Sequence, residues 1–233
     1  MQRLLITFGR SEATKYIAHL DMMRFWERAF RRAHLNLAVS SGFHPHPHFA
    51  LAAPLPVGVT SEGELMEAFL ETSVTPEQCY RALTAQLVPG ISVMGVEEIG
   101  LQLPSLQAQM RFAEYRVTLE SDRIQSDVES SVAELLALTT LPWEHTRDGE
   151  VRHYDLRSQV STLSVASCGN GRCVIEMRLQ CDSNASGRPE QVARALGFPD
   201  HPLNIHRVKL VLSKTPFEQL KPKNSEPAVP SKK

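Results

Sequence analysis

The sequence predicts an α+β protein made of two ferredoxin-like βαββαβ units in tandem, each with an antiparallel sheet. The main observation is that hydrophobic periodicity alternates between the strand period of about 2 and the helix period of about 3.6 in the same order twice along the chain. A second observation is the proline-containing segment 101–109, which separates the two runs as a linker would. We therefore expect one unit over residues 1–100, a second over 111–214 and a disordered basic tail over 215–233.

In the first unit each expected element has its own pattern. Apolar residues alternate along a strand at residues 4–8, whereas Leu20, Met23, Trp26 and Phe30 recur at helical spacing and are expected to face the core. The run Thr75-Pro76-Glu77 has the composition of a helix start, and the helix it opens is expected to reach residue 87. The remaining strands are expected at residues 49–55, 64–71 and 91–99.

The second unit repeats this order, with strands and helices of similar length. Its helices are expected at residues 125–138 and 189–196, and its strands at 112–119, 160–166, 173–180 and 205–212. In this topology both helices of a unit lie on one face of its sheet, which leaves the opposite face free for RNA, a partner or the sister domain. Phe49 and Phe69 are the aromatic candidates in the first unit, and neither strand resembles an RNP motif.

Composition indicates an ordinary globular protein. The 233 residues are 42% hydrophobic and 22% charged, and their formal net charge is −1, which excludes a strongly basic or acidic chain. Because no stretch approaches the roughly 18 apolar residues of a membrane span, we expect no membrane association and a cytoplasmic location. Among Cys79, Cys168, Cys173 and Cys181 there is no CxxC pair, which favours reduced, buried thiols and no bound metal.

Positive charge is concentrated at the N-terminal end of the chain. Residues 1–48 contain seven Lys and Arg residues against three acids. In the first helix Arg24, Arg28 and Arg31 share one side, and Arg32 follows directly. The guanidinium group suits phosphate or carboxylate recognition, so the pattern points to an anionic partner; the alternative is a solvated helix face.

Histidines surround this helix in the sequence. His19 and Asp21 lie at its start, and Phe43, His44 and His46 lie in the run Ser41-Gly42-Phe43-His44-Pro45-His46-Pro47 that follows it. We expect these side chains to lie near one another and to line the specific part of the site. One alternative is that Asp21 only caps the helix and the His-Pro run is a turn or a weak metal site. Another is that two histidines act as general acid and base and cleave RNA without a metal.

In the second unit Arg157 and Arg188 are candidate anion-binding residues. Arg188 precedes Pro189 at an expected helix start, where free backbone amides favour negative charge. The alternatives are an ordinary helix cap there and a simple pair between Asp155 and Arg157. The sequence contains no Walker loop, dinucleotide fingerprint, nucleophile elbow or zinc ribbon.

Several segments together resemble the bacterial radical-SAM-associated domain of unknown function. They are KYIAHLDMMR at 15–24, RAFRRA at 28–33, SGFHPHP at 41–47, PLPVGVTS at 54–61, DLR at 155–157 and RPE at 188–190. The resemblance implies a partnership with a separate radical-SAM protein. This chain has His48 where that domain usually has a basic residue, and it lacks the CxxxCxxC spacing that a radical-SAM cluster needs. A fainter likeness, in topology and histidines, is to the RNA-processing endonucleases of CRISPR systems.

These observations predict an accessory protein, without a cofactor, that binds RNA or another phosphorylated substrate and acts with a separate radical-SAM enzyme. The alternatives are a metal-independent endoribonuclease and a non-catalytic protein-binding scaffold. The predicted substrate-binding residues are His19, Asp21, Arg24, Arg28, Arg31, Arg32, Phe43, His44, His46, Arg157 and Arg188.

Overall fold

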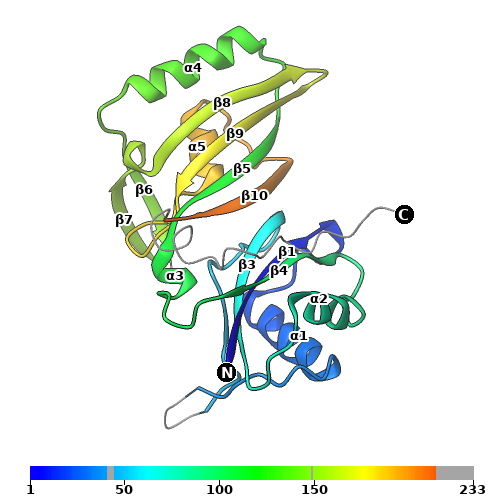
Figure 1. The fold of residues 1–233 in the computed structure, drawn as a ribbon. Coiled ribbons are helices and arrows are strands. Elements are labelled where there is room, and N and C mark those ends of the chain that lie inside the picture. The colour runs from blue at the N-terminus through cyan, green and yellow to red at the C-terminus, as the bar shows by residue number, and fades with distance from the viewer. Residues whose placement is uncertain (41–44, 148, 214–233) are drawn as a thin grey trace. The chain divides into compact units, whose positions relative to one another are not determined.

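The structure is a computed structural model that describes residues 1–40, 45–147 and 149–213. Phe43, His44 and the expected tail at 215–233 lie outside the described residues. The fold is α+β with predominantly antiparallel sheets, as the sequence predicts. The described chain divides into two compact units, one formed by residues 1–110 with residues 212 and 213 and the other by residues 111–211 (Figure 1).

In the described residues of the first unit, four strands and the two longer helices follow the order βαββαβ. Strand β1 pairs antiparallel with both β3 and β4, and β2 pairs antiparallel with β3, so the strand order is β4-β1-β3-β2. The elements are β1 (Gln2–Arg10), α1 (His19–Arg32), β2 (Phe49–Leu51), β3 (Thr60–Leu70), α2 (Pro76–Thr84) and β4 (Ile91–Ile99), with the short helices η1 (Glu12–Thr14) and α3 (Leu106–Gln109).

The core of this unit lies between the sheet and the two helices, and Trp26 of α1 is its largest member. The Trp26 ring packs edge-on against Phe8 of β1, with 5.0 Å between ring centroids. Leu20 was expected in this core, but it is 67% exposed, and Met22 is buried instead. At 3.6 residues per turn Leu20 lies about 200° around the helix from Met22, so both cannot face the sheet.

Helix α2 begins where the sequence predicts. Thr75 forms a capping box with Gln78, in which the Thr75 side chain accepts from the Gln78 amide and the Gln78 side chain accepts from the Thr75 amide. Pro76 occupies the first helical position, where its missing N–H costs nothing. The helix ends at Thr84, three residues before the expected end at residue 87.

Cys79 lies on the buried side of α2, and burial raises the pKa of its thiol to about 12. Because the thiolate is the reactive species, we expect iodoacetamide at pH 8.5 to modify Cys79 in the native protein about a thousandfold more slowly than in urea, where the thiol has its ordinary pKa of about 8.5. Mass spectrometry of the Cys79 peptide over time measures both rates. Similar rates in the two states would contradict the buried position.

The sheet face opposite the helices is partly covered, although the sequence suggested that it would be free. Arg3 of β1 projects from this face and is 2% exposed. Its guanidinium group pairs with Glu67 of β3 and donates to the carbonyls of Gly100, Leu103 and Pro104. The linker after β4 therefore folds back over this face, and the buried guanidinium group of Arg3 binds its carbonyls there.

The second unit has the strand order β10-β5-β9-β8 and carries an additional hairpin, β6–β7. Strand β9 pairs antiparallel with β5 and with β8. The two strands of this hairpin were not predicted from the sequence. The elements are β5 (Met110–Glu120), α4 (Gln125–Ala137), β6 (Pro142–Arg147), β7 (Glu150–Asp155), η2 (Arg157–Gln159), β8 (Val160–Gly169), β9 (Arg172–Gln180), α5 (Pro189–Ala195) and β10 (Asn204–Leu212).

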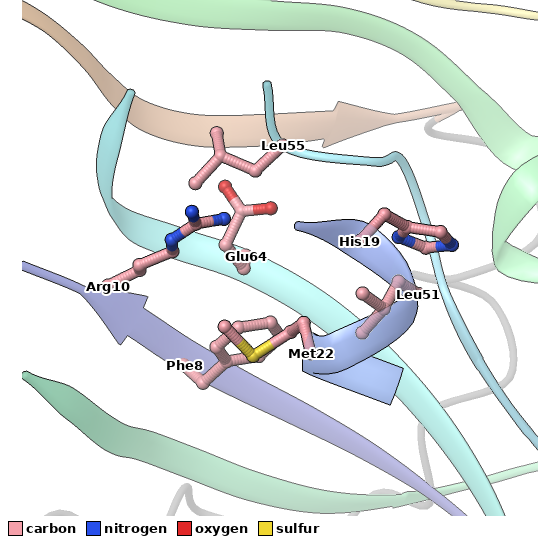
Figure 2. Close-up of a pocket in the computed structure, with 7 residues that line it drawn as sticks. All are labelled: Phe8, Arg10, His19, Met22, Leu51, Leu55 and Glu64. Atoms are coloured by element: carbon pink, nitrogen blue, oxygen red, sulfur yellow. The ribbon is translucent and has the colours of Figure 1, made fainter. Parts of the chain in front are cut away.

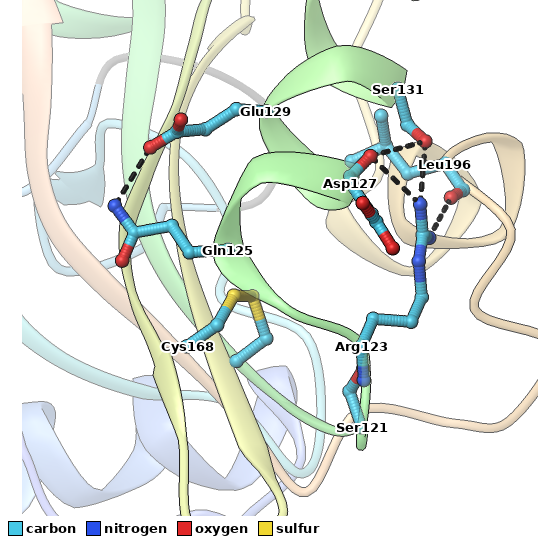
Figure 3. The surroundings of a disulfide bond; sticks show 9 residues. Ser121, Arg123, Gln125, Asp127, Glu129, Ser131, Cys168 and Leu196 are labelled. Carbon is cyan, nitrogen blue, oxygen red and sulfur yellow. Dashed lines mark hydrogen bonds between the residues drawn. A yellow bond between two sulfur atoms is a disulfide. The ribbon is translucent and has the colours of Figure 1, made fainter.

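Cys168 and Cys173 form a disulfide (Figure 3), so the expectation that all four cysteines are reduced is wrong for this pair. The two residues are direct partners in the register of β8 and β9, and their Cα atoms are 4.1 Å apart. A spacing of five residues does not by itself predict this contact. It forms because a tight turn with Asn170 and Gly171 at positive φ places the two cysteines opposite each other. Cys79 and Cys181 are free and buried.

Arg123, also shown in Figure 3, ties the start of α4 to the end of α5. Its guanidinium group donates to the Leu196 carbonyl at 2.9 Å, to the Asp127 carbonyl at 3.1 Å and to the Ser131 hydroxyl at 2.6 Å. Ile124 occupies the N-cap position of α4, and no side chain caps the helix there. In the part of the chain that the structure describes, no helix is long and apolar enough to span a membrane.

Candidate functional site

The start of α1 is set by Arg10, a buried residue at the end of β1. Its Nε donates to the Thr14 carbonyl at 2.9 Å, and its Nη2 donates to the carbonyls of Lys15 and Ile17. The Gly58 amide donates to the same Lys15 carbonyl at 2.8 Å. The segments 15–24 and 54–61, which are distant in sequence, therefore meet at the N-terminal end of α1.

A small pocket lies beside this junction (Figure 2). Its volume is about 10 Å³, enough for roughly one water molecule. Glu64 is buried here and accepts a hydrogen bond from the Ser61 hydroxyl at 2.5 Å. Figure 2 shows the Arg10 guanidinium and the Glu64 carboxylate facing each other, with His19 apart from both at the start of the helix. The lining residues are Phe8, Arg10, His19, Met22, Leu51, Leu55 and Glu64.

Asp21 pairs with Arg24 at 3.0 Å, on the exposed surface of α1. Ala18 occupies the N-cap position of the helix and no side chain caps it, so Asp21 complements the positive end of the helix from within the first turn. Both carboxylate and guanidinium are largely exposed, and such a pair contributes little to stability. Among the described residues, Asp21 contacts Arg24 and forms no hydrogen bond or ion pair with His19.

His46 does not lie near His19, which corrects the expectation that the two histidines share a site. The Ser40 amide donates to the His46 carbonyl at 2.9 Å, and Pro47 forms a bridge with Val39. Pro47 also lines a groove with residues from the C-terminal half of α1. The physical reason is that the 14-residue helix carries the chain about 20 Å away from His19 before the His-Pro run begins.

The four arginines of α1 differ in their surroundings. Arg24 is paired with Asp21, and Arg32 donates to the Gln86 carbonyl at 2.9 Å. Arg28 and Arg31 are exposed and have no hydrogen bond or ion pair with any described residue. Arg28 and Arg31 can therefore bind an external anion without breaking a contact of the described structure, whereas Arg24 and Arg32 would first have to break one.

Arg31 stands at the edge of a groove beside the C-terminal half of α1. The groove has a volume of about 330 Å³, within the size range of small-molecule sites. Its floor is apolar and its rim carries charges of both signs. The lining residues are Glu27, Phe30, Arg31, Leu35, Asn36, Leu37, Val39, Pro47 and Glu71. Next to it His48 stacks on Phe69, with ring centroids 3.8 Å apart, which holds the end of the His-Pro run against the sheet.

In the second unit Arg157 has its donors occupied by main-chain acceptors. Its Nη1 donates to the Val160 carbonyl at 2.8 Å, and its Nη2 donates to the Leu136 carbonyl near the end of α4 at 3.1 Å. Asp155 does not pair with the Arg157 guanidinium; its Oδ1 accepts from the amides of Leu141 and Arg157. Through these contacts Arg157 satisfies a main-chain carbonyl at the C-terminal end of α4.

Arg188, the other candidate of the second unit, contacts His145.

Sequence reasoning missed Arg10 and Glu64. The sequence does contain part of the signal, because Arg10 and Glu64 are charged residues within segments whose other residues predict buried strands. Arg10 donates to main-chain carbonyls beyond the end of its strand, and Glu64 accepts from Ser61 of its own strand. Hydrophobic periodicity alone does not predict such contacts. Within residues 1–40, 45–147 and 149–213 no cluster of three or more His, Cys, Asp or Glu side chains has the arrangement of a metal site.

The fold and these surfaces define a two-unit α+β protein with exposed arginines on its first helix. The chain belongs to the family described as "Uncharacterized protein conserved in bacteria (DUF2344)", which it matches over residues 3–189. Among curated proteins no significant match is found.

The chain is also similar to chains in solved structures, at low identity. It is 10% identical to a chain of a Cbf5-Nop10-Gar1 complex, with a TM-score of 0.50 and with 89% of this chain and 48% of that chain covered. It is 11% identical to a chain of an archaeal box H/ACA sRNP Nop10-Cbf5 complex, with a TM-score of 0.46 and coverages of 88% and 46%. The chain thus spans about half the length of these neighbours, and the likeness concerns the fold alone.

Proposed function

We propose that this protein is an accessory protein that binds RNA or another phosphorylated substrate on the exposed face of α1. The observation that carries the proposal is that Arg28 and Arg31 are exposed and lack a partner among the described residues, whereas Arg24 and Arg32 have one. Guanidinium groups bind phosphate oxygens through charge-assisted, often bidentate hydrogen bonds. Residues three apart on a helix are neighbours, so both can engage one phosphate backbone.

Each unit is proposed to be ferredoxin-like. The order of elements and the strand neighbours β4-β1-β3-β2 and β10-β5-β9-β8 support this assignment. In such a unit the helices lie on one side of the sheet and the edge of the helix layer is open to solvent. The exposed face of α1 is then a surface on which an extended polyanion can lie without rearrangement of the core.

The enzyme with which the protein acts is proposed to be a separate radical-SAM protein. The support is the resemblance of segments 15–24, 41–47 and 54–61 to the radical-SAM-associated domain, together with the lack of a CxxxCxxC triad in this sequence. Affinity purification of the tagged protein from its native host, followed by mass spectrometry, tests the partnership. A radical-SAM protein is expected among the retained proteins, and its absence at native expression levels would contradict the proposal.

An endoribonuclease that pairs His19 with His46 receives less support, because the 14 residues of α1 separate His19 from the segment that carries His46. His44, the other candidate partner of His19, lies outside the described residues. RNA that is retained intact by the purified protein fits the accessory role. RNA that is cleaved, with cleavage lost on replacement of His19, would favour the nuclease instead.

Replacing both Arg28 and Arg31 by alanine is expected to weaken RNA binding about tenfold or more. Two lost phosphate contacts should also reduce the slope of log K against log salt concentration by about 1.4 for single-stranded RNA. Filter binding or fluorescence anisotropy over a salt series measures both quantities. Thermal stability should change little, because both side chains are exposed and unpartnered in the described structure.

The matched control is Arg81→Ala, which removes an exposed arginine of the neighbouring helix α2 that pairs with Glu77. RNA affinity is expected to stay close to that of the unmodified protein. If Arg81→Ala weakens binding as much as the double replacement does, the effect reflects overall charge, and the α1 face is not the binding surface.

A further inference from the structure

The hairpin β6–β7 presents a distinctive set of side chains toward α5. In its register Trp143 lies opposite Tyr154, and His145 lies opposite Arg152. Directly opposed residues of an antiparallel pair project from the same face, so these four side chains share one face of the hairpin. The Tyr154 hydroxyl donates to Oε1 of Gln191, a buried residue of α5, which shows that this face is turned toward the helix.

Arg188, the residue immediately before α5, reaches this face. Its Nη1 lies 2.6 Å from Nε2 of His145. Since an arginine can only donate, Nε2 of His145 is the acceptor, and the imidazole offers no negative charge. Arg152, which is exposed, has no hydrogen bond or ion pair with any described residue. Arg188 therefore contacts His145, Arg152 lies opposite the same histidine in the strand register, and neither arginine has a described carboxylate partner.

Glu190, in the first turn of α5, is the acid nearest in sequence to Arg188 in this helix, and it forms no ion pair with Arg152 or Arg188 among the described contacts. Burial raises the pKa of Tyr154, the positive charge of Arg188 opposes that rise, and the negative charge of Glu190 adds to it. The charge of Arg188 is thus felt on the hairpin face, where it has no direct carboxylate partner among the described residues.

We propose that Arg152, Arg188 and His145 form a binding site for a phosphate group, either inorganic phosphate or the phosphate of a nucleotide. A phosphate between the two guanidinium groups supplies the missing negative charge and accepts several hydrogen bonds. His145 is a positioning residue that orients Arg188. This site goes beyond the function proposed above, because it lies in the second unit and uses no residue of α1.

The two tryptophans allow a direct test by NMR of the ¹⁵N-labelled protein. Trp26 is buried in the first unit and Trp143 lies on the hairpin, so the two indole N–H signals report separately, and Trp143→Phe assigns them. Inorganic phosphate, AMP and adenosine serve as probes. The Trp143 signal is expected to shift saturably with AMP, with phosphate or with both, but not with adenosine, while the Trp26 signal stays in place. A response to AMP alone identifies the phosphate as that of a nucleotide.

Arg152→Gln and Arg188→Gln are each expected to raise the Kd of the responding probe about tenfold or more, as removal of a charge-assisted hydrogen bond should. Arg152 is exposed, so its replacement leaves the fold intact even if that of Arg188 does not. The matched control is Arg194→Gln, an exposed arginine of the same helix. The proposal is overturned if neither anion moves the Trp143 signal, if Arg152→Gln binds normally, or if Arg194→Gln loses as much affinity. Arg28→Ala with Arg31→Ala should leave this response unchanged, which separates the two sites.

Discussion

Replacing Arg3 by alanine is expected to lower the free energy of unfolding by about 3–5 kcal/mol. The side chains of Arg3 and Glu67 are 2% and 5% exposed, so the replacement leaves a carboxylate buried without its cation. It also removes the donors that serve the Leu103 and Pro104 carbonyls at 2.5 and 2.9 Å. Urea denaturation followed by circular dichroism measures the change.

The control for this experiment is Arg116→Ala, which breaks an ion pair with Glu176 whose side chains are each about half exposed. Such a surface pair contributes at most about 1 kcal/mol, so this variant should be nearly as stable as the unmodified protein. Replacing Arg3 and Glu67 together by methionine should recover part of the loss, because no buried charge remains, but not all of it, because the Leu103 carbonyl loses the donor that Arg3 supplies. Equal effects of Arg3→Ala and Arg116→Ala would show that the Arg3 pair is not buried in solution.

Arg10→Ala is expected to cost about 3 kcal/mol and to loosen the start of α1. The guanidinium group donates to the carbonyls of Thr14, Lys15 and Ile17, of which the first two also accept from backbone amides. The replacement therefore removes three hydrogen bonds and leaves the Ile17 carbonyl without this donor, and an unsatisfied buried acceptor costs roughly 1–3 kcal/mol. Hydrogen exchange followed by mass spectrometry should show faster exchange in the first turn of α1 than in its last turn, where Phe30 stays packed in the core.

Lys15→Ala is the matched control for Arg10→Ala. It removes a side chain that pairs with the exposed Glu12 but keeps the Lys15 carbonyl to which Arg10 donates. Its unfolding free energy should change by less than about 1 kcal/mol, and exchange at the start of α1 should stay slow. Faster exchange in Lys15→Ala, or uniform exchange along α1 in Arg10→Ala, would mean that Arg10 does not set the start of the helix.

The sequence by itself determined the α+β class and most of the element order. The reason is that strand and helix periods are local properties, readable within windows of about ten residues. The start of α2 was predictable for the same reason, since Thr75, Pro76 and Gln78 act on adjacent backbone groups. The arginine-rich side of α1 was also readable, because residues at three- and four-residue spacing share a helix face whatever the rest of the chain does.

Only the tertiary structure decided which of these arginines are available. Arg32 is bound by Gln86, 54 residues away, and the buried cations Arg3 and Arg10 pair with groups that no local pattern marks. The length and direction of α1 separate His46 from His19, although the sequence places the two histidines at the start of this helix and in the segment that follows it. Strand register likewise joins Cys168 to Cys173 and places Arg152 beside His145. Such contacts depend on how the elements pack and pair with one another. The periodicity of a single segment does not show which segments lie beside it in space.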